Sequence, residues 1–223
     1  MIEFPSNGHT ASGYLAVPAA GTGPGVVVIQ EWWGLVDHIK EVCDRFAAAG
    51  FVALAPDLYD GKVVEEPDEA GKEMMALQLT EASKALSGAV RELLGRSNRS
   101  TVGVVGFCMG GGLAYVLATT MAEQVSAVAP FYGVIPWPDA KPNYEAMTAA
   151  VQGHYAEHDG FANPEFVRAL EKELEDLGKD VEFYIYPGTE HAFFNDTRPE
   201  VYDAAASSQA WDRLLPFLRE TIR

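Results

Sequence analysis

The chain is poor in cysteine, in positive charge and in long apolar runs. Its 223 residues include two cysteines, and 16 lysines and arginines stand against 32 acidic residues, a formal net charge of -16. Two cysteines are too few for a disulfide framework and are typical of a reducing compartment. So acidic a chain does not offer the basic face that nucleic acids and anionic membranes require.

Hydrophobic targeting and anchoring segments are also missing from the sequence. No apolar run approaches the roughly 18 residues that a membrane-spanning helix needs. The amino terminus, "MIEFPSNGHTASGYL", does not have the basic and apolar parts of a signal peptide. We therefore expect a cytoplasmic protein that binds neither nucleic acid nor membrane and acts on a small molecule.

The sequence contains no repeat, low-complexity tract or linker that would divide it, so we predict one domain over residues 1–223. Short β-branched runs instead alternate with helical patterns. Strands are predicted near 25–30, 51–56, 101–107, 126–133, 149–157 and 181–187, and helices near 37–50, 69–95, 109–121, 164–178 and 199–222. This alternation predicts an α/β fold, a mostly parallel sheet with helices on both faces. Ligands of such sheets bind beyond the carboxyl ends of the strands.

The stretch "GFCMG" at 106–110 places Cys108 between two glycines, after a predicted strand and before a glycine-rich helix start. It matches the G-x-S-x-G turn of α/β-hydrolases, with cysteine in place of serine. Phosphate-binding loops have other spacings, which this stretch does not supply. A cysteine that only fills the core needs no flanking glycines. Cys108 is therefore the candidate nucleophile.

Partners for this nucleophile should follow in the order acid, then histidine. "YAEHDGFANP" places Asp159 just after a predicted strand, and "YPGTEHAFFND" places His191 just after the next one. Each could be an ordinary polar loop residue, but their order and their positions at strand ends favour a triad. His191 would take the thiol proton, and Asp159 would fix the tautomer of its ring.

A zinc-binding pattern also occurs, because "HYAEH" reads H-x-x-E-H from His154 to His158. That motif needs a helix to bring both histidines to one metal. Here it follows a predicted strand, where residues four apart are separated by about 13 Å. We therefore predict no metal and no cofactor.

The same motifs, with "QEWWG" and "APDLY" after the first two buried strands and "HAFFNDTRP" near the carboxyl terminus, resemble the dienelactone hydrolase (carboxymethylenebutenolidase-like) family over nearly the whole chain. The resemblance implies an α/β-hydrolase fold without a large lid domain and a triad of Cys108, His191 and Asp159. It also implies that Glu31 hydrogen-bonds the resting thiol and takes its proton when substrate arrives. The fold places one oxyanion donor at the backbone N–H of Met109, and the resemblance places the second at Trp32.

One position departs from the best-known members of that family. They hold the substrate's carboxylate with arginines, one of them four residues after the histidine, where this chain has Asn195. Arg198 is the nearest replacement, although an ion pair at the terminal helix is the role that we expect for it. The carboxylated dienelactone is therefore in doubt as the natural substrate.

A cysteine nucleophile narrows the reaction further. A thiolate leaves more easily than an alkyl alkoxide, so alkyl esters and amides mostly revert after attack, whereas enol lactones, aryl esters and thioesters go forward. We predict a hydrolase of activated esters or lactones that uses an acyl-cysteine intermediate. A thioesterase, a general carboxylesterase and a catalytically silent binding module with this fold are the alternatives.

Several further residues are open to two interpretations. Cys43 is predicted to lie in the core, and Asp57 is predicted to organise its turn. Five aromatic residues near predicted strand ends could form a pocket wall or pack in the core: Trp32, Trp33, Phe131, Tyr132 and Phe193.

Overall fold

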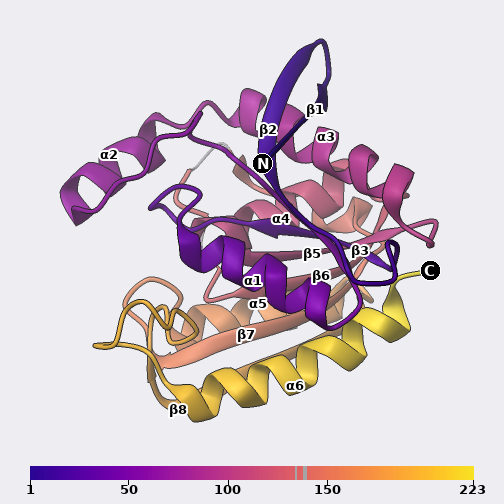
Figure 1. Cartoon of the computed structure of the whole chain (residues 1–223). Coiled ribbons are helices and arrows are strands. Elements are labelled where there is room, and N and C mark those ends of the chain that lie inside the picture. Colours follow the sequence, from indigo (N-terminus) through magenta and orange to yellow (C-terminus); the bar gives the residue numbers. More distant parts are fainter. Residues whose placement is uncertain (134, 138–139) are drawn as a thin grey trace.

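The structure, a computed structural model, describes residues 1–133, 135–137 and 140–223. One eight-stranded sheet runs through it in the order β1-β2-β4-β3-β5-β6-β7-β8 (Figure 1). The strands are β1 (Ile2–Ser6), β2 (His9–Ala16), β3 (Gly25–Ile29), β4 (Val52–Pro56), β5 (Val102–Phe107), β6 (Val125–Phe131), β7 (Ala150–His158) and β8 (Val181–Glu190). The β1–β2 and β2–β4 pairs are antiparallel and the other pairs are parallel, which confirms the predicted mostly parallel sheet.

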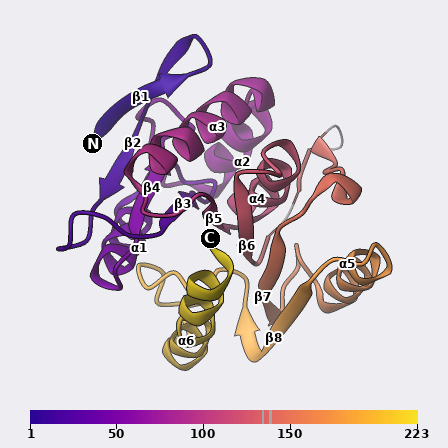
Figure 2. The ribbon, with the colours of Figure 1, turned by 90° about the vertical axis from the view of Figure 1, so that its right-hand side faces the viewer.

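Helices cover both faces of the sheet, as predicted. They are α1 (Asp37–Ala48), α2 (Pro67–Ala76), α3 (Leu79–Arg96), α4 (Met109–Thr120), α5 (Pro164–Asp176) and α6 (Ala204–Thr221), with a 3-10 turn at Tyr144–Ala146. Helices α1 and α6 pack on one face, and α3, α4 and α5 pack on the other (Figure 2). The central strands β3, β4, β5 and β6 are therefore buried along their whole length, which explains their continuous apolar sequences.

Local signals in the sequence set the helix ends. Helix α5 begins with Pro164 after Asn163, whose side chain accepts a hydrogen bond from the N–H of Phe166. It buries Val167, Leu170 and Leu174, which share one helical face, against the sheet. Gly178, with φ of 70°, follows its end.

Three local predictions were incomplete. The sequence reading missed the amino-terminal hairpin of β1 and β2, whose mixed burial gives a weak pattern. The helix predicted over 69–95 is two helices, because the backbone is extended at Leu77, with φ of -56° and ψ of 124°. Helix α3 packs on the sheet, whereas α2 buries only Ala70 and lies away from the sheet at the upper left of Figure 1. The terminal helix begins at Ala204 and not near 199, since Asp203 caps it.

No helix in the described part of the chain is both long enough and apolar enough to pass through a bilayer.

Candidate active site

Four of the predicted site residues lie at one edge of the sheet because each follows a parallel strand. Cys108 comes directly after β5, Asp159 directly after β7 and His191 directly after β8, while Glu31 lies two residues beyond the end of β3. Parallel strands end at the same edge, so the topology brings these four side chains together.

The backbone at Cys108 is strained, as expected for the predicted sharp turn between β5 and α4. Its φ is 54° and its ψ is -120°, in a region that residues with side chains rarely adopt. A Cβ on Gly106 would overlap the carbonyl oxygen of Gly110, and a Cβ on Gly110 would lie 2.5 Å from the carbonyl oxygen of Gln30. The two flanking glycines are therefore required by contact between β3, β5 and the first turn of α4.

His191 and Asp159 form a tight pair next to the cysteine. The Nδ1–H of His191 donates to Oδ2 of Asp159 at 2.7 Å. The other carboxylate oxygen of Asp159 accepts the backbone N–H groups of Phe161 at 2.7 Å and of Ala162 at 2.9 Å. These bonds fix both the carboxylate and the orientation of the imidazole ring.

The pair also favours a positively charged imidazole. Burial alone lowers the pKa of His191, but hydrogen bonds to Asp159 and to Cys108, and the negative charges of both groups, outweigh burial and raise this pKa to about 10. Burial raises the pKa of Asp159, yet its hydrogen bond to His191 and its two backbone donors bring that pKa below the usual value. The site thus favours an imidazolium–carboxylate pair beside the sulfur.

Glu31 is 1% exposed, and both its carboxylate oxygens are hydrogen-bonded. The hydroxyl of Tyr132 donates to Oε1 at 3.2 Å, and the amide nitrogen of Asn195 donates to Oε2 at 2.8 Å. The orientation of that amide is fixed, because its oxygen accepts both the N–H and the hydroxyl of Thr197. Asn195, at the position where the best-known members of the family that this chain resembles have arginine, is therefore a neutral hydrogen-bond donor to Glu31.

Two backbone N–H groups are candidates for an oxyanion hole. Met109 is the first residue of α4, so its N–H has no acceptor within the helix. Trp32 lies in the turn that follows β3, at the same sheet edge as Cys108. Met109 thus follows Cys108 directly at the start of α4, and Trp32 lies at the same sheet edge, so both N–H groups are candidates to bind a carbonyl oxygen held at the sulfur.

A cavity of about 690 Å³ opens above Cys108. Cys108, His191 and Glu31 line it, and the remaining wall is mainly apolar and aromatic. This part of the wall is formed by Trp32, Trp33, Pro67, Met74, Ile135, Pro136, Phe161, Ala192 and Val201. Of the five aromatic residues with two interpretations, Trp32 and Trp33 line the cavity, whereas Phe131, Tyr132 and Phe193 are fully buried.

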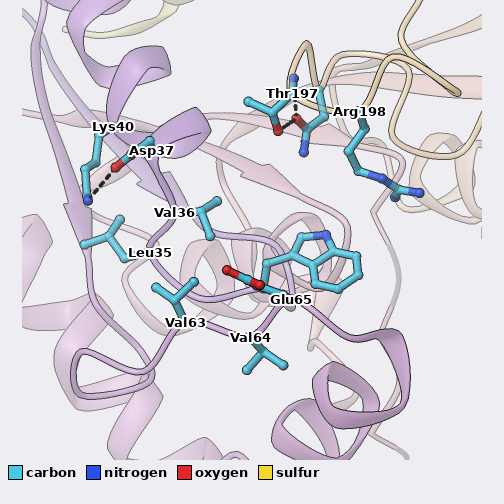
Figure 3. Close-up of a pocket in the computed structure, with 11 residues that line it drawn as sticks. Leu35, Val36, Asp37, Lys40, Val63, Val64, Glu65, Thr197 and Arg198 are labelled. Atoms are coloured by element: carbon cyan, nitrogen blue, oxygen red, sulfur yellow. Dashed lines mark hydrogen bonds and ion pairs between the residues drawn. The ribbon is translucent and has the colours of Figure 1, made fainter.

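Figure 3 shows a second cavity, of about 540 Å³. It shares Trp33 and Arg198 with the first cavity. Lys40 and Asp37 form an ion pair at 2.9 Å on the side opposite Arg198, so these charges satisfy each other (Figure 3). Asn195 also lines this cavity, although its amide nitrogen is bonded to Glu31.

Sequence reasoning missed three contributors to the site. The sequence indicates Tyr132 only as a pocket wall or core residue and Asn195 only as an absent arginine, and it does not single out Phe161. Phe161 and Asn195 follow Asp159 and His191 by two and four residues, so closeness to those motifs was the available signal. The contact between Tyr132 and Glu31 joins positions 101 residues apart, and no sequence spacing could reveal it. Asp57 accepts the N–H groups of Tyr59 and Gly61, as expected for a turn residue.

Known proteins resemble this chain over nearly its whole length. A family model described as "Dienelactone hydrolase family" matches residues 11–222. "Protein usf" of Aquifex pyrophilus is 40% identical, covering 99% of this chain and 97% of its own length. The "Putative carboxymethylenebutenolidase" of Aquifex aeolicus is 36% identical, covering 100% of this chain and 99% of its own. A solved Klebsiella pneumoniae structure aligns with a TM-score of 0.89 at 25% identity, covering 98% of this chain and 96% of that one.

Proposed function

Because the chain belongs to the dienelactone hydrolase family, and is thus a carboxylic ester hydrolase with an α/β-hydrolase fold, we propose that it hydrolyses activated esters or enol lactones through Cys108, His191 and Asp159. The proposal includes an acyl-cysteine intermediate. One observation carries it: His191 is held by Asp159 at 2.7 Å and lines the same cavity as Cys108, which lies at a strained turn. No structural role requires these features together.

Acylation begins with the sulfur of Cys108 as thiolate and His191 as imidazolium. The sulfur attacks the carbonyl carbon, and the carbonyl π electrons move to the oxygen, which then accepts the N–H groups of Met109 and Trp32. When the tetrahedral intermediate collapses, the bond to the leaving oxygen breaks, and the imidazolium donates its proton to that oxygen. The products of this half-reaction are the acyl-cysteine, a neutral imidazole and an alcohol or enol; a lactone keeps the enol attached to its acyl part.

Deacylation uses the same groups in the reverse order. Neutral His191 takes a proton from water, and the oxygen of that water attacks the acyl carbon. The second tetrahedral intermediate expels the thiolate and releases a carboxylic acid, so that the imidazolium and thiolate of the starting state are restored. Asp159 keeps its proton-free form and holds the ring through both halves.

Glu31 has a secondary part in this proposal. Its negative charge beside Cys108 would disfavour a thiolate, and substrate binding that displaces the carboxylate would remove this penalty. In the structure the two oxygens of Glu31 accept hydrogen bonds from Tyr132 and Asn195, and the implied bond to the thiol is not among its hydrogen bonds. These two donors are therefore the groups that would hold the carboxylate when it is turned away from the sulfur. His191 is then the group placed to accept the thiol proton.

The substrate class follows from the leaving groups. A thiolate is expelled far more easily than an alkoxide, but its advantage over a phenoxide or an enolate is small, so aryl esters, enol esters and enol lactones are favoured over alkyl esters. Thioesters are also expected substrates, because their leaving group is itself a thiolate. A hydrolysis screen should therefore compare phenyl acetate, an enol lactone, an acyl thioester and ethyl acetate.

Two cysteine variants test the nucleophile. We expect Cys108→Ala to abolish measurable turnover of phenyl acetate and to remove labelling by iodoacetamide. Cys43→Ala is the matched control: Cys43 is completely buried, and burial raises its pKa, so that change should leave both readouts intact. Unchanged hydrolysis by Cys108→Ala would exclude the triad, and a preference for ethyl acetate over phenyl acetate would exclude the substrate class.

A further inference from the structure

We propose that the cavity above Cys108 is a subsite for an uncharged, planar aromatic or unsaturated group, and that Phe161 is a specificity-determining residue of this subsite. The inference rests on the proposed function and names its substrate class. It excludes substrates that carry a carboxylate in this cavity.

Phe161 is placed as a binding residue and not as a core residue. Its side chain is 64% exposed, although it lines the cavity. Its backbone N–H donates to the carboxylate of Asp159, which holds the backbone at Phe161 next to the proposed triad. An exposed ring at the mouth of an apolar cavity gains contact only when something covers it.

Two neighbouring rings complete an aromatic surface around the mouth. The ring of Phe161 lies 5.0 Å from that of His191, at an interplanar angle of 58°. It lies 6.4 Å from the ring of Trp32, at 69°. The first pair is tilted and the second is edge-to-face, so a flat ligand bound here would meet the faces or edges of aromatic rings.

The charges around the cavity disfavour an anion. The carboxyl groups of Glu31 and Glu190 both line it, and so do the imidazoles of His158 and His191, of which His191 is already paired with Asp159. Arg198 is the single lysine or arginine among its described lining residues, and its guanidinium is paired with Glu200 at 2.8 Å. An anionic ligand at Arg198 would compete with Glu200 for the guanidinium and would lie near two further acids. The chain's net charge of -16 adds a repulsive field to this local arrangement.

The first experiment compares two exposed phenylalanines. Phe161→Ala should lower kcat/KM for phenyl acetate by about 2- to 10-fold relative to vinyl acetate, an enol ester without a ring. Phe161→Leu should lower this ratio of kcat/KM values by less, because leucine keeps apolar area although it has no ring. Phe166→Ala is the matched control, since Phe166 is 44% exposed on α5 and outside the cavity. It should leave the phenyl-to-vinyl ratio unchanged.

The second experiment tests charge. Methyl 4-acetoxybenzoate should be hydrolysed at least about ten times more efficiently than 4-acetoxybenzoate, after each rate is divided by that of hydroxide hydrolysis. Raising the ionic strength should increase kcat/KM for the anionic substrate and leave kcat/KM for the neutral substrate unchanged, because salt screens the repulsion. A preference for the anion that disappears in Arg198→Gln would overturn the proposal and identify a carboxylate site.

A binding measurement separates this inference from the triad. Acetanilide, an amide that the proposed mechanism does not hydrolyse, should bind the wild type more tightly than 4-acetamidobenzoate in ligand-detected NMR, and Phe161→Ala should weaken it. If Cys108-dependent turnover of vinyl acetate persists while Phe161→Ala changes no ratio, the subsite is refuted and the triad stands. If acetanilide binds as stated but Cys108→Ala retains turnover, the subsite stands and the triad is refuted.

Discussion

Replacing Asp159 by asparagine should leave the fold intact and set the imidazole in the wrong tautomer. In the structure, one oxygen of Asp159 accepts the N–H groups of Phe161 and Ala162. The oxygen of an asparagine would keep those two bonds, so its NH₂ group would face Nδ1 of His191. That nitrogen would then have to accept a hydrogen bond. The ring proton would move to Nε2, the nitrogen that should take the proton from Cys108.

The expected fall in kcat/KM follows from the loss of the charge of Asp159 and of its hydrogen bond to His191. The hydrogen bond and the charge of Asp159 are among the causes that raise the pKa of His191 to about 10, so the substitution should lower that pKa towards its usual 6.5. A tautomer exchange of this kind costs a serine protease about 10⁴ in kcat. We expect kcat/KM for phenyl acetate to fall about 10³- to 10⁴-fold, which corresponds to roughly 4–5.5 kcal/mol at 1.36 kcal/mol per factor of ten.

The assay is phenyl acetate hydrolysis over a range of pH, with the rate of iodoacetamide labelling as a second readout. The midpoint of thermal unfolding measured in parallel shows whether the fold is kept. A folded Asp159→Asn protein whose kcat/KM stays within about tenfold of the wild type would refute the tautomer argument, and with it the assignment of Asp159 to the triad.

Three further predictions concern stability. Gly106→Ala should lower the midpoint of thermal unfolding by several degrees, because its Cβ would overlap the carbonyl oxygen of Gly110; an unchanged midpoint would contradict the packing of the turn. Tyr132→Phe should reduce the free energy of unfolding in urea by about 1–3 kcal/mol, since it removes a donor to buried Glu31, and no reduction would mean that this bond is weak. The pKa of His191 is raised to about 10 in the native state, so its contribution to stability is complete below its ordinary pKa of about 6.5 and is lost as pH rises through 10. The free energy of unfolding should fall across this window, and less steeply in His191→Gln; equal slopes would argue against the raised pKa.

The parts of the fold that sequence predicted are those whose signals are local. Continuous apolar runs indicated the parallel strands, and the glycines around Cys108 indicated a sharp turn, because close backbone contact leaves no room for a side chain. The positions of Asp159 and His191 followed from strand ends, since parallel topology alone brings such positions to one edge.

The parts that sequence did not predict depend on distant contacts. The break between α2 and α3 at Leu77 carries neither proline nor glycine. It occurs where α3 packs on the sheet and α2 instead reaches the cavity with Pro67 and Met74. The partners of Glu31 are likewise set by tertiary structure, because Asn195 lies 164 residues away along the chain. Propensity and spacing carry no information on such pairs.

Backbone strain at the sheet edge connects the fold with the site. Five residues other than glycine have positive φ in the described part of the chain, and three of them, Cys108, Tyr132 and Ala192, border the cavity or hold a group in it. Each such conformation costs roughly 1–3 kcal/mol and persists only where its surroundings impose it. The N–H of Cys108 donates to the carbonyl of Phe131, and that of Tyr132 donates to the carbonyl of His154. Hydrogen bonds between adjacent strands and loops thus offset the strain, and they aim the sulfur and the hydroxyl that contacts Glu31 into one site.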